Sequence, residues 1–434
     1  MTRVAVVGAG ISGLTVAYEL LQLGLDRTEL AVLDSGDRPG GNIQTETAKG
    51  FRIEAGPNGF LDNSPPTLDL VRRLGIQDRL LPSRDSAARR FIFRDGRLHL
   101  VPTGPAAMLT SPILSLRGRL RVFSEMFVPQ GGHPEETVFD FAARRIGKEA
   151  AEIFVDPMVS GVFAGNARQL ELQAAFPRMA EMEARYGSLV KALFSIQRER
   201  RRARKTQGDG KASGGGGPAG PGGRLTSFLD GMEELPRALA AQLGPALRLE
   251  TKVRGVQKNP AGGFFIDLEQ GESLRAEEVV LACPAPQAAA LVHHLDPALS
   301  SVLQEIPCAP ISVAATAYKV EDVGRAPWGF GFLVPRGQGV RILGCLWTSS
   351  IWGEHRAPEG TVLLRTMLGG MHDPAAAGFD DDELLALAAE NLSRTMGLRA
   401  RPILQRIFRY PQGIPQYVPG HMARRRRIAA QLGR

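Results

Sequence analysis

The first 34 residues hold the feature that most constrains the fold, a glycine-rich turn between an apolar segment and an amphipathic one. Residues 3–7 predict a short buried strand. Gly8, Gly10 and Gly13 follow at GxGxxG spacing, and from Ile11 the apolar residues recur at helical spacing. This order predicts a Rossmann-like dinucleotide-binding unit, because the free N–H groups at a helix N-terminus bind phosphate.

The spacing assigns each glycine a separate task. Gly8 permits the tight turn, Gly10 lets the backbone approach a pyrophosphate, and Gly13 lets the helix pack closely on the strand. A second apolar segment, ELAVLDS, leads to Asp34, about 20 residues beyond the glycines, where an acidic residue accepts hydrogen bonds from ribose hydroxyls. The alternative, a strand–turn–helix without a ligand, leaves the position of Asp34 to chance.

The next stretch, DSGDRPGGNIQTE, distinguishes between the dinucleotides. It places Arg38, Gly40 and Gly41 just after the acidic residue. A second glycine pair lets more backbone close on the diphosphate, and an arginine supplies charge and a fork of donors. The combination of GxGxxG, acid and RxGG resembles the FAD-binding start of the flavin amine oxidase superfamily.

A Gly-Pro loop follows in the segment FRIEAGPNGF. In that superfamily an ExGP-like loop runs alongside the flavin, whereas taken alone the same residues form an ordinary turn. The resemblance implies flavin contacts for four residues of the loop, which are Gly56, Pro57, Asn58 and Gly59.

Cysteine usage and hydropathy narrow the class of protein. Cys283, Cys308 and Cys345 are scattered without CxxC spacing, which argues against a disulfide framework or a metal site and indicates a reducing compartment. The sequence contains no run of about 18 apolar residues, so it predicts no transmembrane helix. Because the chain starts directly in a predicted strand, we expect no cleaved signal or transit peptide and a cytoplasmic location.

The net charge of +8 suits nucleic acid, an anionic membrane surface or a polycarboxylate substrate. Aromatic residues make up only 6% and no nucleic-acid-binding motif occurs, so the last two are favoured. The arginine- and glycine-rich residues 198–223 predict a flexible linker, whose charge serves either a solvated loop or a contact with anionic lipid.

The pattern along the chain predicts an α/β fold with two sheets and a helical excursion. Residues 105–200 predict mostly helices, and RLETKVRGVQ, GGFFIDLEQ and EEVVLACPA then predict strands that return to the first sheet. Four later segments show enough alternation of apolar and polar residues to predict strands of a second sheet. They are ISVAATAYKV, GFGFLVP, VRILGCLWTSS and TVLLRTMLGG. DDDELLALAAENLSRTMGL predicts a helix with an acidic first turn.

Several longer stretches resemble the protoporphyrinogen oxidase family of that superfamily. The most specific is DPMVSGVFAGNARQLELQAAFP, and others are GPNGF, RRFIFRDGRLHLVP, TSFLDGMEELPRAL, GFGFLVP and GIPQYVPGH, in order through nearly the whole chain. The implied domains are a Rossmann-like FAD-binding domain at 1–85 and 225–292, an antiparallel-sheet substrate domain at 86–99 and 293–420, a helical membrane-binding domain at 100–200, and a linker at 201–224.

The resemblance implies further cofactor contacts. Asp34 stands where the family usually has Glu, and either carboxylate accepts hydrogen bonds from ribose. Val253 matches a strand residue whose backbone contacts adenine. Tyr410 stands where the family often has another residue beside the flavin, which leaves its role open. The complete implied set is Gly8, Gly10, Ile11, Ser12, Gly13, Asp34, Arg38, Gly40, Gly41, Gly56, Pro57, Asn58, Gly59, Val253 and Tyr410.

A substrate site is implied by the same resemblance. Arg90 matches the arginine that pairs with a substrate propionate, although the neighbouring Arg89 leaves that assignment open by one place. One loop lies over the substrate macrocycle and two apolar side chains sandwich its pyrrole rings. These residues are Phe163, Ala164 and Gly165 in the loop, then Leu333 and Trp352.

The implied reaction is the oxidation of protoporphyrinogen IX, an apolar macrocycle with two carboxylates, to protoporphyrin IX. A meso carbon loses hydride to FAD and the pyrrole nitrogens lose protons, so we expect no side-chain catalytic residue and no metal. Oxygen, giving hydrogen peroxide, or another acceptor reoxidises the flavin. The implied partners are the inner membrane, contacted peripherally, and a second copy of the chain in a homodimer, with no nucleic acid.

Two alternatives stay open at this stage. The first is oxidation of coproporphyrinogen III, whose four carboxylates require more basic groups in the pocket. The second is an inactive flavin-fold protein. The family continues beyond a segment like GHMARRRRIAAQLGR with a strand and a Gly-rich turn that cap the flavin. We expect this chain to lack that cap and to bind FAD weakly.

Overall fold

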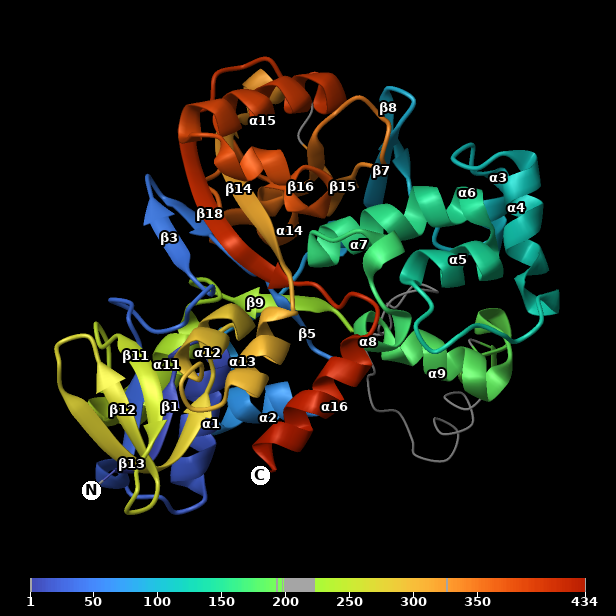
Figure 1. The fold of residues 1–434 in the computed structure, drawn as a ribbon. Coiled ribbons are helices and arrows are strands. Elements are labelled where there is room, and N and C mark those ends of the chain that lie inside the picture. Colours follow the sequence, from blue (N-terminus) through green and yellow to red (C-terminus); the bar gives the residue numbers. More distant parts are fainter. Residues whose placement is uncertain (1, 193, 197, 199–222, 325–326, 434) are drawn as a thin grey trace. The chain divides into compact units, whose positions relative to one another are not determined.

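The computed structural model describes residues 2–192, 194–196, 198, 223–324 and 327–433 (Figure 1). Apart from residues 223 and 224, the predicted linker at 201–224 lies outside the described residues. The chain divides by its internal contacts into two compact units. The first unit comprises Met1–Pro82, Leu225–Ile306 and Ala423–Arg434, and the second comprises Ser83–Arg224 and Pro307–Met422.

A six-stranded sheet organises the first unit in the order β10-β2-β1-β13-β12-β11 (Figure 1). The strands from β10 to β13 in this order pair in parallel, whereas β12 pairs antiparallel with both β13 and β11. This parallel centre confirms the predicted α/β class and the return of the later strands to the first sheet. The strands are β1 (Thr2–Val7), β2 (Leu30–Leu33), β10 (Leu247–Arg248), β11 (Val253–Lys258), β12 (Phe264–Leu268) and β13 (Ser273–Leu281).

The side chains of β1 alternate between two cores because successive strand residues point to opposite faces. Val4 and Val6 join a cluster that includes apolar residues of helices α1 (Ile11–Gln22) and α11 (Glu234–Leu243). Ala5 joins a second cluster with residues of β2 and β12. Helix α1 therefore packs on the sheet, and its N-terminus lies at the carboxyl end of β1, where open α/β sheets bind their ligands.

Smaller elements complete the first unit. They are β3 (Thr45–Ala48), β4 (Phe51–Glu54), β5 (Phe60–Leu61), β6 (Leu80–Pro82), β9 (Leu225–Phe228), α2 (Pro65–Arg73), α12 (Ala285–Leu291), α13 (Pro297–Gln304) and, from Ala423 onward, α16 (His421–Leu432). Residues 293–306, which the sequence placed in the substrate domain, cluster with this unit. One reason is that α13 is fastened to α12, since the Ser300 hydroxyl donates to the Ala289 carbonyl (2.8 Å).

The second unit is built on a seven-stranded sheet in the order β18-β14-β17-β16-β15-β7-β8 (Figure 1). All neighbours pair antiparallel except β15 and β7, which pair in parallel. The antiparallel second sheet expected from the sequence is thus present. Its strands are β7 (Arg90–Arg94), β8 (Arg97–Leu100), β14 (Cys308–Lys319), β15 (Gly331–Leu333), β16 (Ile342–Trp347), β17 (Thr361–Gly369) and β18 (Leu404–Pro415).

Helix α15 (Asp381–Met396) packs on this sheet through Leu384, Ala388 and Leu392. The Asp380 side chain accepts from the N–H of Glu383, and the Glu383 side chain accepts from the N–H of Asp380 in a capping box. Its acidic first turn and its position confirm the helix predicted from the sequence. Other helices of the unit, within the described residues, include α3 (Pro105–Thr110), α4 (Leu116–Phe123), α5 (Val138–Ile146), α6 (Lys148–Ala150), α7 (Asp156–Phe163), α8 (Leu172–Ala175), α9 (Pro177–Tyr186) and α14 (Thr348–Trp352).

The helical segment shares the second unit with the antiparallel sheet instead of forming a unit of its own. Ile92 of β7 packs in one cluster with Ile113 and Ile153 from the helical segment. A continuous apolar core therefore joins the two parts. Separating them would expose these buried side chains to water, which is unfavourable. The function that the resemblance assigns to each of these domain ranges stays a prediction.

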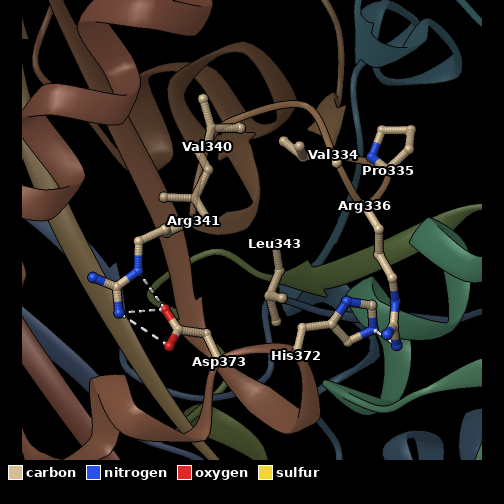
Figure 2. Close-up of a pocket in the computed structure, with 10 residues that line it drawn as sticks. Val334, Pro335, Arg336, Val340, Arg341, Leu343, His372 and Asp373 are labelled. Carbon is tan, nitrogen blue, oxygen red and sulfur yellow. Dashed lines mark hydrogen bonds and ion pairs between the residues drawn. The ribbon is translucent and has the colours of Figure 1, made fainter.

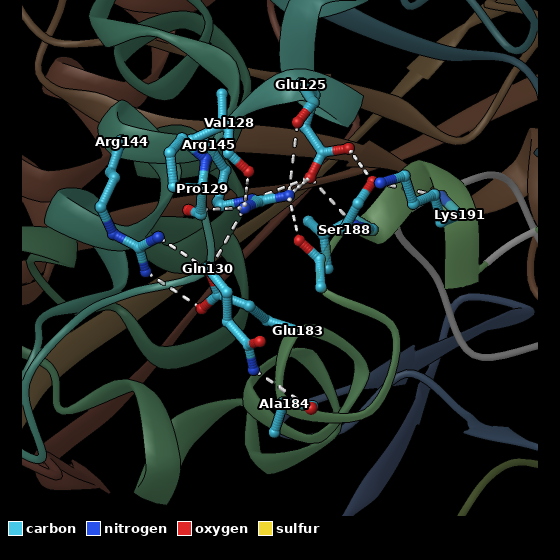
Figure 3. Close-up of polar contacts among 12 residues, drawn as sticks. Glu125, Val128, Pro129, Gln130, Arg144, Arg145, Glu183, Ala184, Ser188 and Lys191 are labelled. Carbon is cyan, nitrogen blue, oxygen red and sulfur yellow. Dashed lines mark hydrogen bonds and ion pairs between the residues drawn. The ribbon is translucent and has the colours of Figure 1, made fainter.

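A buried ionic network fixes the helical segment (Figure 3). Arg145 of α5 is fully buried, and its guanidinium forms an ion pair with Glu125, which is also buried, and another with Glu183. The Glu125 carboxylate also accepts from the Ser188 hydroxyl (2.6 Å) and from the N–H groups of residues 189 and 190. These contacts tie together parts of the chain that are 20 and 63 residues apart.

Candidate functional site

The glycine turn has the backbone geometry that its spacing predicts. Gly8 has φ +108°, a left-handed conformation that favours glycine. A Cβ atom on Gly13 would lie 1.9 Å from the Gly8 carbonyl oxygen, so only glycine allows this close approach of helix and turn. The tight turn and the close packing expected of these two residues are confirmed.

The surroundings of Gly10 fit a diphosphate. A Cβ atom on Gly10 would meet no atom within 4 Å, so a ligand can approach this stretch of backbone. Helix α1 begins directly after Gly10, at Ile11 and Ser12, and no side chain caps its first turn. Uncapped N–H groups and the positive end of the helix dipole beside open space form a binding site for an anion.

The second glycine pair lies against the first turn. The Gly40 N–H donates to the Ala9 carbonyl (2.8 Å), and a Cβ atom on Gly41 would lie 3.3 Å from the Gly10 Cα atom. The Arg38 guanidinium donates to the carbonyl oxygens of Gly41 (2.7 Å) and Ile43 (3.0 Å) and to Gln44 (3.1 Å). In this structure Arg38 fastens the loop, and its contact with the diphosphate stays a prediction.

The Asp34 carboxylate lies at the same end of the sheet. Its oxygens accept from the N–H groups of Ala9 (2.6 Å) and Gly36 (2.7 Å), and each retains capacity for a further hydrogen bond. The Thr251 N–H donates to the Asp34 carbonyl (2.7 Å), which brings the start of β11, at Val253, alongside the acid. This arrangement leaves Asp34 able to accept from ribose hydroxyls beside the glycine turn.

The loop Gly56–Gly59 belongs to the same unit. Pro57 is exposed, and Asn58 and Gly56 are half-buried. A Cβ atom on Gly59 would lie 2.8 Å from the Thr226 carbonyl, so Gly59 is needed for the loop to pack against β9. The loop is thus fixed at one end and exposed at Pro57, and its contact with the flavin stays a prediction.

In the second unit, Arg90 begins β7 at the surface. Its guanidinium lies over the Phe330 ring at 5.1 Å from the centroid. The residue is exposed, but the protein packed around it partly desolvates the guanidinium and lowers its pKa. Among the described residues no carboxylate pairs with Arg90. Arg89 instead stacks on the Trp328 ring at 4.6 Å. An arginine with desolvated surroundings, solvent access and no acidic partner is suited to an incoming carboxylate.

The segment Ser160–Gly165, called the 160–165 segment below, ends helix α7. Ala164 has φ +48°, and its carbonyl accepts from the Met371 N–H (2.7 Å). The Phe163 carbonyl accepts from the Gln416 amide (2.8 Å). Ala164 and Gly165 are buried, while the half-buried Phe163 ring packs edge-on against aromatic rings at 176 and 417. The segment therefore exposes Val162 by 57%, half-buries Phe163 and buries the two residues after it.

The two predicted sandwich residues differ in position. The Leu333 side chain packs on α7, since a Cβ atom on Gly161 would lie 2.7 Å from Leu333 Cδ2. Trp352 of α14 is only 1% exposed and lies under the Arg356 guanidinium at 5.8 Å, so its ring is part of the core and offers no free face to a pyrrole. Tyr410 is half-buried in β18, where it pairs with Ile311 of β14.

Sequence reasoning missed the residues that hold the 160–165 segment in place, among them Gln416 and His372. Gln416 lies in the stretch GIPQYVPGH, which assigned it no contact, and His372 belongs to none of the stretches named above. Their partners are 253 and 207 residues away in the chain. Within the part of the chain that the structure describes, no cluster of histidine, cysteine and acidic side chains is placed to hold a metal ion. No helix among those residues has the length and apolar character needed to cross a bilayer.

Comparison with known proteins identifies the family of the chain. The family model for flavin containing amine oxidoreductase matches residues 11–434. The chain is 32% identical to protoporphyrinogen oxidase 1 of the Arabidopsis thaliana chloroplast, over 97% of this chain and 79% of that protein. It is 27% identical to coproporphyrinogen III oxidase of Bacillus subtilis, over 99% and 90%.

Solved structures show the same fold. A crystal structure from Exiguobacterium sp. 255-15 superposes with a TM-score of 0.81 at 23% identity, over 99% of this chain and 91% of that one. Reduced UDP-galactopyranose mutase gives 0.72 at 14% identity, over 100% and 88%. Together with the open, uncapped glycine turn, these matches establish that the chain belongs to the flavin-containing amine oxidoreductase family and is an FAD-dependent oxidoreductase.

Proposed function

We propose that this protein oxidises protoporphyrinogen IX to protoporphyrin IX in heme biosynthesis, with oxygen as the electron acceptor. The observation that carries the proposal is identity of 32% over almost the whole chain to plant enzymes named protoporphyrinogen oxidase. The unpaired Arg90 supports it, because this substrate combines an apolar macrocycle with carboxylates.

The chemistry divides between cofactor and chain. The conversion removes six hydrogens, so FAD, when bound, would accept hydride in three successive rounds with reoxidation by oxygen between them, while growing conjugation of the macrocycle drives the reaction. Gly10 and Asp34 hold the cofactor through its diphosphate and ribose, Arg90 orients one propionate, and Phe163 covers the macrocycle. The named residues therefore bind and orient the cofactor and the substrate.

Coproporphyrinogen III is the second candidate substrate. Bacterial relatives named coproporphyrinogen III oxidase match over 90% and 92% of their own lengths, against 79% and 76% for two of the plant enzymes. Initial rates of porphyrin fluorescence with each porphyrinogen decide between them. We expect a higher kcat/KM for protoporphyrinogen, and the opposite order would assign the protein to coproporphyrinogen.

Arg90→Ala is expected to raise KM for the porphyrinogen by about 30-fold, which corresponds to roughly 2 kcal/mol for a propionate left without its charged partner. We expect kcat to change much less, because the residue binds a group remote from the reacting carbon. Arg89→Ala is the matched control, since Arg89 stacks on Trp328. A normal KM in Arg90→Ala with a raised KM in Arg89→Ala would move the assignment by one residue.

We also propose that the enzyme is cytoplasmic and binds the inner membrane peripherally through α3, α4 and the turn after α4. Five large apolar side chains are exposed there, which are Leu109 of α3 by 51%, Leu116 by 67%, Leu120 by 60%, Phe123 by 36% and Phe127 by 79%. The neighbouring Arg117 is exposed and the chain carries a net charge of +8. Apolar groups beside cations suit an anionic lipid surface.

Sedimentation with vesicles that contain anionic lipid tests this surface. We expect the wild type to co-sediment at low salt and less at high salt, because salt screens the electrostatic part. The double variant Leu120→Ser/Phe127→Ser should lose binding at both salt concentrations. Leu23→Ser, at an isolated apolar residue that is 83% exposed in the first unit, is the control. Equal binding of the double variant and the control would refute the assigned surface. Size-exclusion chromatography of the same samples tests the predicted homodimer.

A further inference from the structure

His372 contacts two groups with opposite hydrogen-bonding requirements. It ends the turn Gly370–His372 and lines a cleft of about 420 Å³ together with residues 334–337, 340 and 341 of the 334–341 loop between β15 and β16 (Figure 2). Its Nε2 atom lies 2.8 Å from the Gly165 carbonyl oxygen and 2.9 Å from Nη2 of Arg336. The same atom lies 2.9 Å from the Ser160 hydroxyl.

These contacts cannot all be hydrogen bonds at the same time. A carbonyl oxygen only accepts, and a guanidinium only donates. When Nε2 carries a proton it donates to Gly165 and meets Arg336 as donor against donor. When Nε2 lacks the proton it accepts from Arg336 and turns a lone pair toward the Gly165 oxygen. The tautomer of His372 therefore determines which of the two partners is held.

Arg336 stays close to His372 in both tautomers. Its Nε atom donates to Oδ2 of Asp156 (3.0 Å), and Asp156 is buried at the start of α7. This ion pair holds the 334–341 loop against α7, whose other end carries the 160–165 segment. His372 thus lies at the point where the loop, the helix and the segment meet.

We propose that His372 is a positioning residue that exchanges between the Gly165 carbonyl and Arg336, and so couples the 334–341 loop to the 160–165 segment. When Nε2 donates to Gly165, the 160–165 segment is held in the arrangement that covers the substrate. When Nε2 accepts from Arg336, the loop gains a tie and the segment loses one. The identity of the substrate in this proposal rests on the proposed function.

Protonation should favour one of the two states. Four further ionisable groups lie at the same cleft or at the His372 partners. Arg336, Arg341 and Asp373 line the cleft (Figure 2), and Asp156 pairs with Arg336. Burial and the charge of Arg336 lower the pKa of His372, and Asp156 opposes them. The imidazolium only donates, so as the pH falls through this lowered pKa, below the usual value of about 6.5, the tie to Gly165 is held continuously. KM for the porphyrinogen should therefore decrease in acid.

Two substitutions of His372 in the FAD-loaded enzyme test the coupling. In His372→Gln the amide can donate to Gly165 and accept from Arg336 at the same time. KM should therefore be low and should vary by no more than about twofold between pH 5 and pH 8. His372→Leu removes both ties and should raise KM by about tenfold while kcat stays within about threefold. His294→Gln, at the surface of the first unit, should keep the wild-type pH profile. A kcat loss in His372→Leu without a KM change would overturn the positioning role.

Nitrogen NMR of ¹⁵N-histidine-labelled holoenzyme gives a readout that does not depend on turnover. The His372 signals, identified by their loss in His372→Gln, should show averaged tautomers at neutral pH and two protonated ring nitrogens in acid. A single fixed tautomer over the whole pH range would overturn the exchange. If the labelled enzyme holds FAD and oxidises neither porphyrinogen, the proposed function fails while the NMR result still decides the behaviour of His372.

Discussion

Gly10→Val is expected to yield a folded protein that purifies with less than about a tenth of the wild-type FAD content, because affinity depends on contacts that the side chain would displace. Nothing in the protein lies within 4 Å of the position that the new Cβ atom takes, so the fold has room for it. The same space is where a diphosphate meets the uncapped N-terminus of α1. Flavin absorbance per mole of purified protein and a thermal melt measure the two halves of this expectation.

Gly131→Val is the matched control for this substitution. Gly131 also has open space around its Cβ position and no left-handed backbone, but it lies in a loop of the second unit. It should retain full flavin content. Gly13→Val should fail to fold, because its Cβ atom would overlap the Gly8 carbonyl oxygen. A folded Gly10→Val protein that keeps its flavin would refute the placement of the diphosphate.

Glu125→Gln is expected to lower the free energy of unfolding by about 3–5 kcal/mol, the usual cost of leaving a buried ion without its partner. The substitution keeps the shape of the side chain and removes the charge that faces the buried Arg145. It also places an amide N–H against donors, among them the Ser188 hydroxyl. Urea denaturation of both proteins measures the difference.

An exposed pair provides the comparison for this buried one. Glu354 pairs with Arg84 at the surface, and Glu354→Gln should change the free energy of unfolding by about 1 kcal/mol or less. Equal losses in the two variants would show that the buried network does not stabilise the helical segment more than a surface pair does.

The network should also give the protein a defined sensitivity to acid. Burial opposes ionisation of Glu125, but hydrogen bonds from Ser188, Arg145 and two backbone N–H groups outweigh it and hold its pKa below the usual value of 4.5. The carboxylate therefore stabilises the folded state above about pH 4.5, and this stability is lost as the pH falls through the lowered pKa. The loss should be absent from Glu125→Gln.

The nucleotide end of the site could be predicted from sequence because its causes are local. Gly8 is required by the backbone conformation, Gly13 by the packing distance and Asp34 by the hydrogen bonding of the turn. All three requirements arise within about 30 residues of the chain. The period of the apolar residues likewise fixed β1 and α15 to within a residue or two. Such constraints leave a direct record in the order of residue types.

The substrate end depends on contacts between distant segments and left a weaker record. β18 contains Pro411, Gly413 and Pro415, which are unfavourable in the middle of a sheet, and it was not predicted. Its place at the edge beside β14 explains how the sheet accepts them. Trp352 matched a family position, yet only the packing of α14 shows that its ring is buried. The sequence alone could not predict that His372 contacts Gly165.

The most direct test of an FAD-dependent porphyrinogen oxidase is anaerobic mixing of the flavin-loaded protein with protoporphyrinogen, followed by flavin absorbance and porphyrin fluorescence together. We expect the oxidised flavin band to bleach on mixing and to return when oxygen is admitted, while porphyrin fluorescence grows with each cycle. Arg90→Ala should need more substrate to produce the same bleaching. A flavin that stays oxidised in excess of both protoporphyrinogen and coproporphyrinogen would contradict the assignment.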